Sequence, residues 1–328
     1  MNLMPAETDA RLRSAMQQVL LACLPGLLVL FWVFGWGVLF NLLCTTAAAL
    51  ATEAALLRLR QRPVRVALND GSALVSACLL AVALPAHVPW WLPVIAAGSA
   101  IALGKQLYGG VGRNPFNPAM LGYGVVLLSF PVHMTHWPTP QGLDFAHSLD
   151  ALFGLGDRPD AWAGATVLDG LRQNRSLTVD ELFASHPGFG HFAGRSSEWA
   201  SLAFLASGLF LLQRKVISWH APVAMLASLF VISLLCWNGS GSDSNGSPLL
   251  HLLAGSTMLC AFFIVTEPVS GPKTPWGRLM FGAGVGVLIY LIRTWGNYPD
   301  GAAFAVLLMN LGVPALDRWA ERRQGEAP

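Results

Sequence analysis

Residues 19–57, VLLACLPGLLVLFWVFGWGVLFNLLCTTAAALATEAALL, form an apolar run whose one charged residue is Glu53. A membrane-spanning helix needs about 20 mostly apolar residues, so this run is about twice the length of one span. Gly35, Gly37 and Asn41 lie near its middle, where the sequence predicts a tight hairpin between two helices. The run therefore indicates a membrane protein with more than one pass.

The composition of the whole chain agrees with this prediction. Of 328 residues, 54% are hydrophobic and 12% are charged, whereas soluble domains carry about 25% charged residues. The formal charge of +2 is too small to indicate a nucleic-acid partner. The five cysteines lie in apolar runs without a CxxC pair, which favours helix packing over a metal site or disulfides.

Further apolar runs follow along the chain and predict an all-α polytopic membrane protein with about ten transmembrane helices. The predicted spans are 19–38, 40–57, 72–88, 90–107, 118–135, 199–213, 217–236, 249–266, 279–294 and 300–317. They divide the chain into two five-helix halves, 19–135 and 199–317. Trp residues cluster at the predicted span ends, where their rings would contact the lipid headgroups.

The distribution of basic residues predicts the orientation. With a cytoplasmic N-terminus (1–18), most Lys and Arg residues fall in segments on the inner side, as the positive-inside rule requires. The C-terminus (318–328) is then also cytoplasmic, and the long segment 136–198 is a periplasmic loop of a bacterial inner-membrane protein. The loop is the main region outside the membrane, and we expect the chemistry there.

A weak internal repeat relates the two halves. Gly112–Ala119 and Gly296–Ala303 both read GxxPxxxA, and each opens the last helix of its half. The first would enter from the inside and the second from the outside, which predicts two inverted repeats. Coincidence also explains three shared positions.

The predicted periplasmic loop contains the segment Asp160-Ala-Trp-Ala-Gly164-Ala165-Thr166. It resembles the pattern Asp-x-x-[Ser/Thr]-Gly-Ala-Thr, on which a flavin transferase attaches FMN to the threonine. The chain resembles the RnfD subunits of Rnf electron-transport complexes and, more distantly, the NqrB subunits of the sodium-pumping NADH:quinone reductases. Three further segments carry the resemblance over nearly the whole chain: Gly110–Pro118, Thr266–Val269 and Tyr298–Asn310. Ala163 replaces the usual small hydroxyl residue, and Glu267 stands where Asp is common.

The resemblance implies that Thr166 carries FMN through a phosphoester and that the flavin transferase recognises Asp160. Gly164 and Ala165 would leave the approach to the hydroxyl open. The threonine itself would be a redox-silent tether, because the flavin supplies the redox chemistry. Taken alone, the segment also reads as a loop turn with Asp160 as a helix cap.

Other polar residues near the spans suggest further sites. Asn114 and Asn117, flanked by prolines, could line a pocket for a second flavin such as riboflavin, because unwound backbone at membrane depth must face protein or a cavity. Glu53 and Asp300 are candidates for a cation path, since ionisable groups inside a membrane are often functional. Asp70, Glu267 and Asp317 are instead interpreted as interfacial caps, and no metal site is expected.

The resemblance implies a non-autonomous component of a translocase that passes electrons between reduced ferredoxin and NAD and moves Na+ or H+ outward. Iron–sulfur and flavin subunits would be its partners, because the sequence contains no motif for an iron–sulfur cluster or a dinucleotide. Two alternatives stay open. One is the NqrB-like component of the quinone reductase, and the other is a flavin-free secondary transporter with the loop as a lid.

Overall fold

The fold is described from a computed structural model, which describes residues 6–139, 142–155, 163–164, 166–174, 176–185, 188–298 and 300–325. The first half contains α1 (Ala6–Phe34), α2 (Trp36–Leu59), α3 (Val64–Leu68), α4 (Ser72–Ala83), α5 (Trp91–Ser99), the π-helix η1 (Ala100–Gln106), α6 (Pro118–Ser129) and α7 (Pro131–Thr135). The connecting segment contains β1 (Trp137–Pro138), α8 (Phe145–Phe153), β2 (Ala163–Gly164), α9 (Val167–Gln173) and α10 (Val179–Ser185). The second half contains α11 (Arg195–Gln213), α12 (His220–Leu235), α13 (Pro248–Leu253), α14 (Thr257–Leu259), the π-helix η3 (Cys260–Ile264), α15 (Pro275–Trp295) and α16 (Ala302–Gly325).

The prediction of a helical membrane protein is confirmed. Each predicted span contains helix in the structure. Three helical segments of the described chain are long and apolar enough to cross a membrane, namely Ala10–Phe34, Trp36–Leu59 and Pro275–Trp295. Shorter apolar helices are Ser72–Ala83, Pro118–Ser129 and His220–Leu235. The chain is therefore a multi-pass membrane protein, while the number of ten spans stays a prediction.

The predicted hairpin in residues 19–57 has its turn at Gly35. This residue has a φ of 73° and separates α1 from α2. A Cβ atom there would lie 2.7 Å from the carbonyl oxygen of Leu143. Because glycine has no Cβ atom, Gly35 allows both the left-handed backbone and the close approach of the connecting segment.

The predicted span 249–266 is not one continuous helix. It breaks at Ala254–Ser256, between α13 and α14, where Gly255 has a φ of 63°. Arg293 donates hydrogen bonds to the carbonyl oxygens of His251 (2.8 Å) and Ala254 (3.4 Å). A break at membrane depth is tolerated because other protein groups pair the freed backbone.

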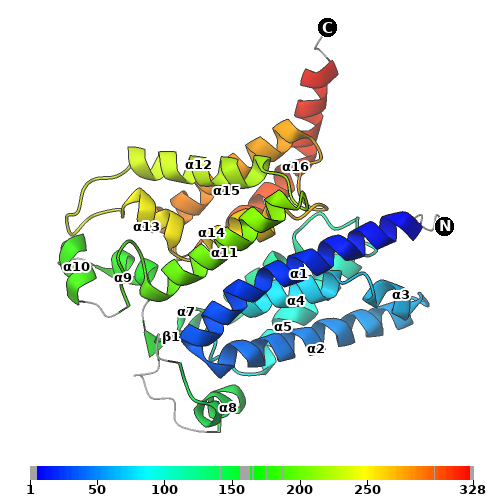
Figure 1. The fold of residues 1–328 in the computed structure, drawn as a ribbon, viewed down its shortest axis with the longest axis horizontal. Helices are drawn as coiled ribbons and strands as arrows, with labels where there is room; N and C mark the ends of the chain where they lie inside the picture. Colours follow the sequence, from blue (N-terminus) through cyan, green and yellow to red (C-terminus); the bar gives the residue numbers. More distant parts are fainter. Residues whose placement is uncertain are drawn as a thin grey trace.

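The helices lie roughly along one direction (Figure 1). The N-terminus lies at the right of the view and the C-terminus at the top, whereas α9 and α10 lie at the left and α8 at the bottom, so the connecting segment lies away from both termini. Helix α1 packs on α11, and α6 packs on α16, so helices of the two halves contact each other in the core. A small apolar cluster, which includes Leu168, Phe189 and Leu250, holds the connecting segment against α13.

Candidate functional site

Thr166 lies at the start of α9, where it is the N-cap residue. Its Oγ1 accepts a hydrogen bond from the backbone N–H of Asp169 (3.2 Å) and donates one to Oδ2 of that carboxylate (2.6 Å). Two residues earlier, Gly164 pairs with Trp137 in the antiparallel β1–β2 ladder. The cap and the ladder together fix the threonine. Asp160 and Ala165 lie outside the described residues.

A cavity of about 520 Å³ begins beside Thr166. Gly164 and Thr166 line it together with residues of α1, α4, α6 and α7 from the first half and of α11, α14 and α16 from the second. Its aromatic lining residues are Phe34, Tyr123, Trp137, Phe204 and Tyr298. Arg195 and Asp300 also line it. The cavity is therefore lined by both halves of the protein and by the segment that carries Thr166.

These residues fit a tethered FMN. Pockets for cofactors typically measure about 300–1,000 Å³ and are mostly apolar with a few polar groups, which describes this cavity. Aromatic side chains provide faces for a flat ring, and the Arg195 guanidinium provides a charge opposite to that of a phosphate. Thr166 is half-buried and lines the cavity, so a group attached to its hydroxyl would start beside this space.

Asp300, which lines this cavity, forms an ion pair with the buried Arg293. Its Oδ1 lies 3.0 Å from Nη2 of Arg293, and its Oδ2 accepts hydrogen bonds from the backbone N–H (2.8 Å) and hydroxyl (2.7 Å) of Ser256. Arg293 also donates to the hydroxyl of Thr257 at 2.9 Å. Asp300 is thus compensated in charge and connects α15 to the broken helix α13–α14.

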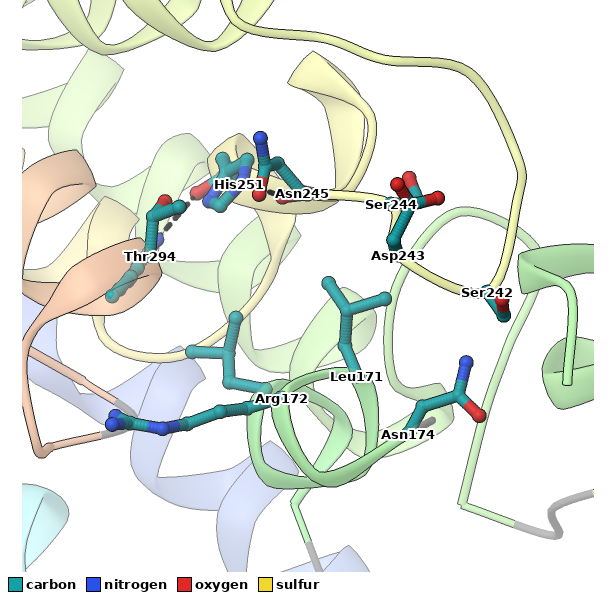
Figure 2. Close-up of a pocket in the computed structure, with 11 residues that line it drawn as sticks. Leu171, Arg172, Asn174, Ser242, Asp243, Ser244, Asn245, His251 and Thr294 are labelled. Atoms are coloured by element: carbon teal, nitrogen blue, oxygen red, sulfur yellow. Dashed lines mark hydrogen bonds between the residues drawn. The ribbon is translucent and has the colours of Figure 1, made fainter. Parts of the chain in front are cut away.

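A smaller pocket of about 190 Å³ includes Arg293 in its lining. It is bounded by α9, the Ser/Gly-rich loop after α12, α13 and the end of α15, as Figure 2 shows. The ring of His251 contacts the carbonyl oxygen of Asn245 at 2.8 Å and so fastens the loop to α13. Because Arg293 lines this pocket and Asp300 lines the larger cavity, the ion pair separates the two.

Asn114 and Asn117 lie in a buried polar cluster at the start of α6. The side chain of Asn117 caps α6 by accepting from the N–H of Met120 (3.1 Å), and the backbone N–H of Asn117 donates to the side-chain oxygen of Asn310 on α16 (3.1 Å). Asn114 donates to the carbonyl oxygen of Phe116 (3.1 Å). Asn310 also donates to the carbonyl oxygen of Ser270 (3.0 Å). The segments Gly110–Pro118 and Tyr298–Asn310, which carry the family resemblance, therefore contact each other here. A second flavin at this cluster stays a prediction.

Glu53 lies in another buried cluster, in the first half. Its Oε1 lies 2.5 Å from Nζ of Lys105 and accepts a hydrogen bond from the amide of Gln106 at 2.9 Å. No motif in the sequence marks Lys105, Gln106 or Arg293 as site residues. Lys105 and Arg293 stand inside predicted spans, and that position alone would have identified them as candidates.

The fold and the cavity define the class of protein: a multi-pass helical membrane protein with a cofactor-sized cavity that Thr166 lines. The chain belongs to the NQR2, RnfD, RnfE family, whose model matches residues 5–325. The resemblance read from the sequence is thereby confirmed.

Relatives of the chain share one name, which designates each of them the D component of an ion-translocating oxidoreductase complex. The relative from Ectopseudomonas mendocina is 61% identical over 318 residues, covering 97% of this chain and 93% of the relative. The protein of the same name from Cellvibrio japonicus is 46% identical over 327 residues, covering 97% and 92%. That of Citrobacter koseri is 45% identical over 326 residues, covering 94% and 93%.

Proposed function

We propose that the chain is the membrane flavoprotein component of an Rnf-type ion-translocating ferredoxin:NAD oxidoreductase and carries electrons through FMN esterified to Thr166. The observation that carries this proposal is the presence of Thr166 in the lining of a cavity of about 520 Å³ that also contains five aromatic side chains. Membership of the family and the names of the relatives support it.

The residues around Thr166 suit its attachment chemistry. In the attachment, Oγ1 forms a bond to the flavin-side phosphorus of FAD, the bond from that phosphorus to the bridging oxygen breaks so that AMP leaves, and the hydroxyl proton goes to a base. Asp169 already accepts that proton in a hydrogen bond of 2.6 Å, so this carboxylate is the base that we propose. A separate flavin transferase would supply the nucleotide.

Bound FMN would supply one- and two-electron chemistry, while this chain holds and orients the ring. The cavity walls would exclude water, and the Arg293–Asp300 pair would set the charge below the ring. Other iron–sulfur and flavin subunits of the complex would deliver and remove the electrons. Na+ or H+ translocation would follow from the coupling of these steps to the helical core.

We also propose the predicted topology, with both termini inside, the connecting segment in the periplasm, and two inverted repeats. In support, α1 packs on α11 and α6 packs on α16; α1 and α11 correspond to the first predicted span of each half, and α6 and α16 correspond to the last. Corresponding helices of the two halves thus contact each other, as expected for repeats related by a pseudo-twofold axis. Movement of an electron to an outer, positive side is favourable by about 2.3 kcal/mol per 100 mV, so the position of the flavin matters for coupling.

The test is covalent flavin on the protein co-expressed with a flavin transferase. We expect a fluorescent band in a denaturing gel and an intact mass increased by the FMN adduct. Thr166→Ser should keep the adduct because it keeps the hydroxyl, whereas Thr166→Ala should abolish it. Thr178→Ala is a matched control in the same segment. An adduct on Thr166→Ala, or none on the wild type, would refute the attachment.

A further inference from the structure

The cluster around Glu53 contains charged groups that the flavin chemistry does not use. Glu53 on α2 is 0% exposed, Lys105 on η1 is 3% exposed, and Gln106 is 2% exposed. Nζ of Lys105 donates to the hydroxyl of Ser72 (2.6 Å) and lies 3.8 Å from Oδ2 of Asp70. Ionisable groups buried at such a position need compensation or a ligand.

The charges of this cluster do not cancel. Two carboxylates, Glu53 and Asp70, face one ammonium group, Lys105. Arg60 follows α2 and donates to the backbone carbonyl of Gln106, but its side chain is exposed to the solvent. Glu53 and Lys105 are buried and cancel each other, and the partly exposed Asp70 adds one negative charge. Without the exposed Arg60 the cluster therefore carries one excess negative charge, which one monovalent cation would neutralise.

Two buried oxygen atoms in the cluster have no hydrogen-bond donor among the described residues. They are Oε2 of Glu53 and Oε1 of Gln106. An unpaired buried acceptor costs about 1–3 kcal/mol and commonly marks an ion or a water molecule. Because hard cations take carboxylate and amide oxygens as ligands, both atoms are suitable donors to such a cation.

The π-helix explains why the side chains of two adjacent residues both contact one carboxylate. Lys105 and Gln106 end η1, and both contact the same oxygen of Glu53. Short π-helical segments occur often at functional sites, because the extra residue changes where the side chains point. Asp70, with a side chain 19% exposed, provides the contact of this cluster with the surface.

We propose that Glu53 and Gln106 bind a monovalent alkali cation, with the ammonium of Lys105 as a built-in competitor for the same carboxylate. The proposal deepens the proposed ion-translocating function and does not depend on the flavin. Movement of Lys105 toward Asp70 would free Glu53 for the cation, and its return would expel the cation. The probe for the test is Na+, with choline as the non-binding replacement.

The experiment measures the unfolding temperature of the purified, unflavinylated full chain in detergent against Na+ at constant ionic strength. We expect a saturable rise in the wild type, because a ligand of the folded state stabilises it. Lys105→Gln should lower the half-saturating Na+ concentration by about tenfold, since it removes the competing charge. Glu53→Gln should abolish the rise.

Two further variants keep the test decisive. Gln106→Leu keeps the Glu53–Lys105 pair but removes one unpaired oxygen, so it should weaken Na+ binding even if Glu53→Gln does not fold. Glu321→Gln, at an exposed carboxylate of α16, should behave as the wild type. Equal effects of Na+ and choline in the wild type, or an unchanged response in Gln106→Leu and Lys105→Gln, would overturn the site. Because no flavin is present, this result is independent of the attachment test.

Discussion

The guanidinium of Arg293 pairs two backbone carbonyls that the break between α13 and α14 leaves without helical partners, and it neutralises Asp300. Arg293→Met should therefore lower the free energy of unfolding by about 3–5 kcal/mol, as loss of one partner of a buried ion pair does. Chemical unfolding in detergent would measure this change. Arg172→Met, at an exposed arginine of α9, should change the free energy by less than about 0.5 kcal/mol.

The double variant Arg293→Met/Asp300→Asn makes the same prediction more specific. Removal of both charges should recover part of the lost stability, because neither charge then stays buried without a partner. If the double variant loses as much as the sum of the two single variants, the pair contributes no coupling and the interpretation of the ion pair is wrong.

At the scale of residues, the sequence predicts which positions carry charge but not how they pair. Glu53 and Asp300 are recognisable because acids are rare in apolar runs. Their partners, Lys105 and Arg293, lie on other helices, and only the packing brings each pair together. Thr166 is recognisable from its motif, whereas its contact with Asp169 depends on the cap geometry of α9.

Helices α12 and α15 pack closely because of a pair of glycines. A Cβ atom at Gly282 would lie 2.2 Å from the carbonyl oxygen of Ala221, and one at Gly286 would lie 2.3 Å from that of Met225. These glycines are four residues apart on α15, the spacing of small residues in close membrane-helix contacts. Neither backbone oxygen can move away cheaply.

Gly286→Ala should therefore destabilise the protein by roughly 1–3 kcal/mol through overpacking. The unfolding temperature in detergent would show the loss. The matched control is Gly284→Ala on the same helix, where the new methyl group meets only the side chain of Met309, which can move. Equal losses in the two variants would show that the contact between α12 and α15 does not limit stability.

At the scale of elements, hydrophobicity predicts that helices form but not where they break. The runs 40–57 and 279–294 correspond to α2 and α15. The run 72–88 ends early at Ala83, since Pro85 and Pro89 follow. The break in 249–266 is stabilised by Arg293 and Asp300, which lie elsewhere in the sequence. Residues 249–266 alone therefore do not predict it.

For the whole molecule, the proposed orientation makes a prediction about access from outside the cell. Ser242 and Asn174 line the pocket that α9 also lines, and Thr166 caps that helix. Arg62 instead lies between α2 and α3, and α3 lies at the right of Figure 1 with the N-terminus. In a background without native cysteines, Ser242→Cys should react with an impermeant maleimide in intact cells. Arg62→Cys should react only after permeabilisation, and the reverse pattern would invert the topology.

The contact between Asn117 and Asn310 has a consequence for biosynthesis. Asn310 accepts the N–H of Asn117, yet these residues are 193 positions apart in the chain. At about 5–20 residues per second, roughly 10–40 s of synthesis separates them. During that interval the polar beginning of α6 has no final partner. The nascent first half must therefore wait, shielded by the insertion machinery or by water at the bilayer surface, until the last helix emerges from the ribosome.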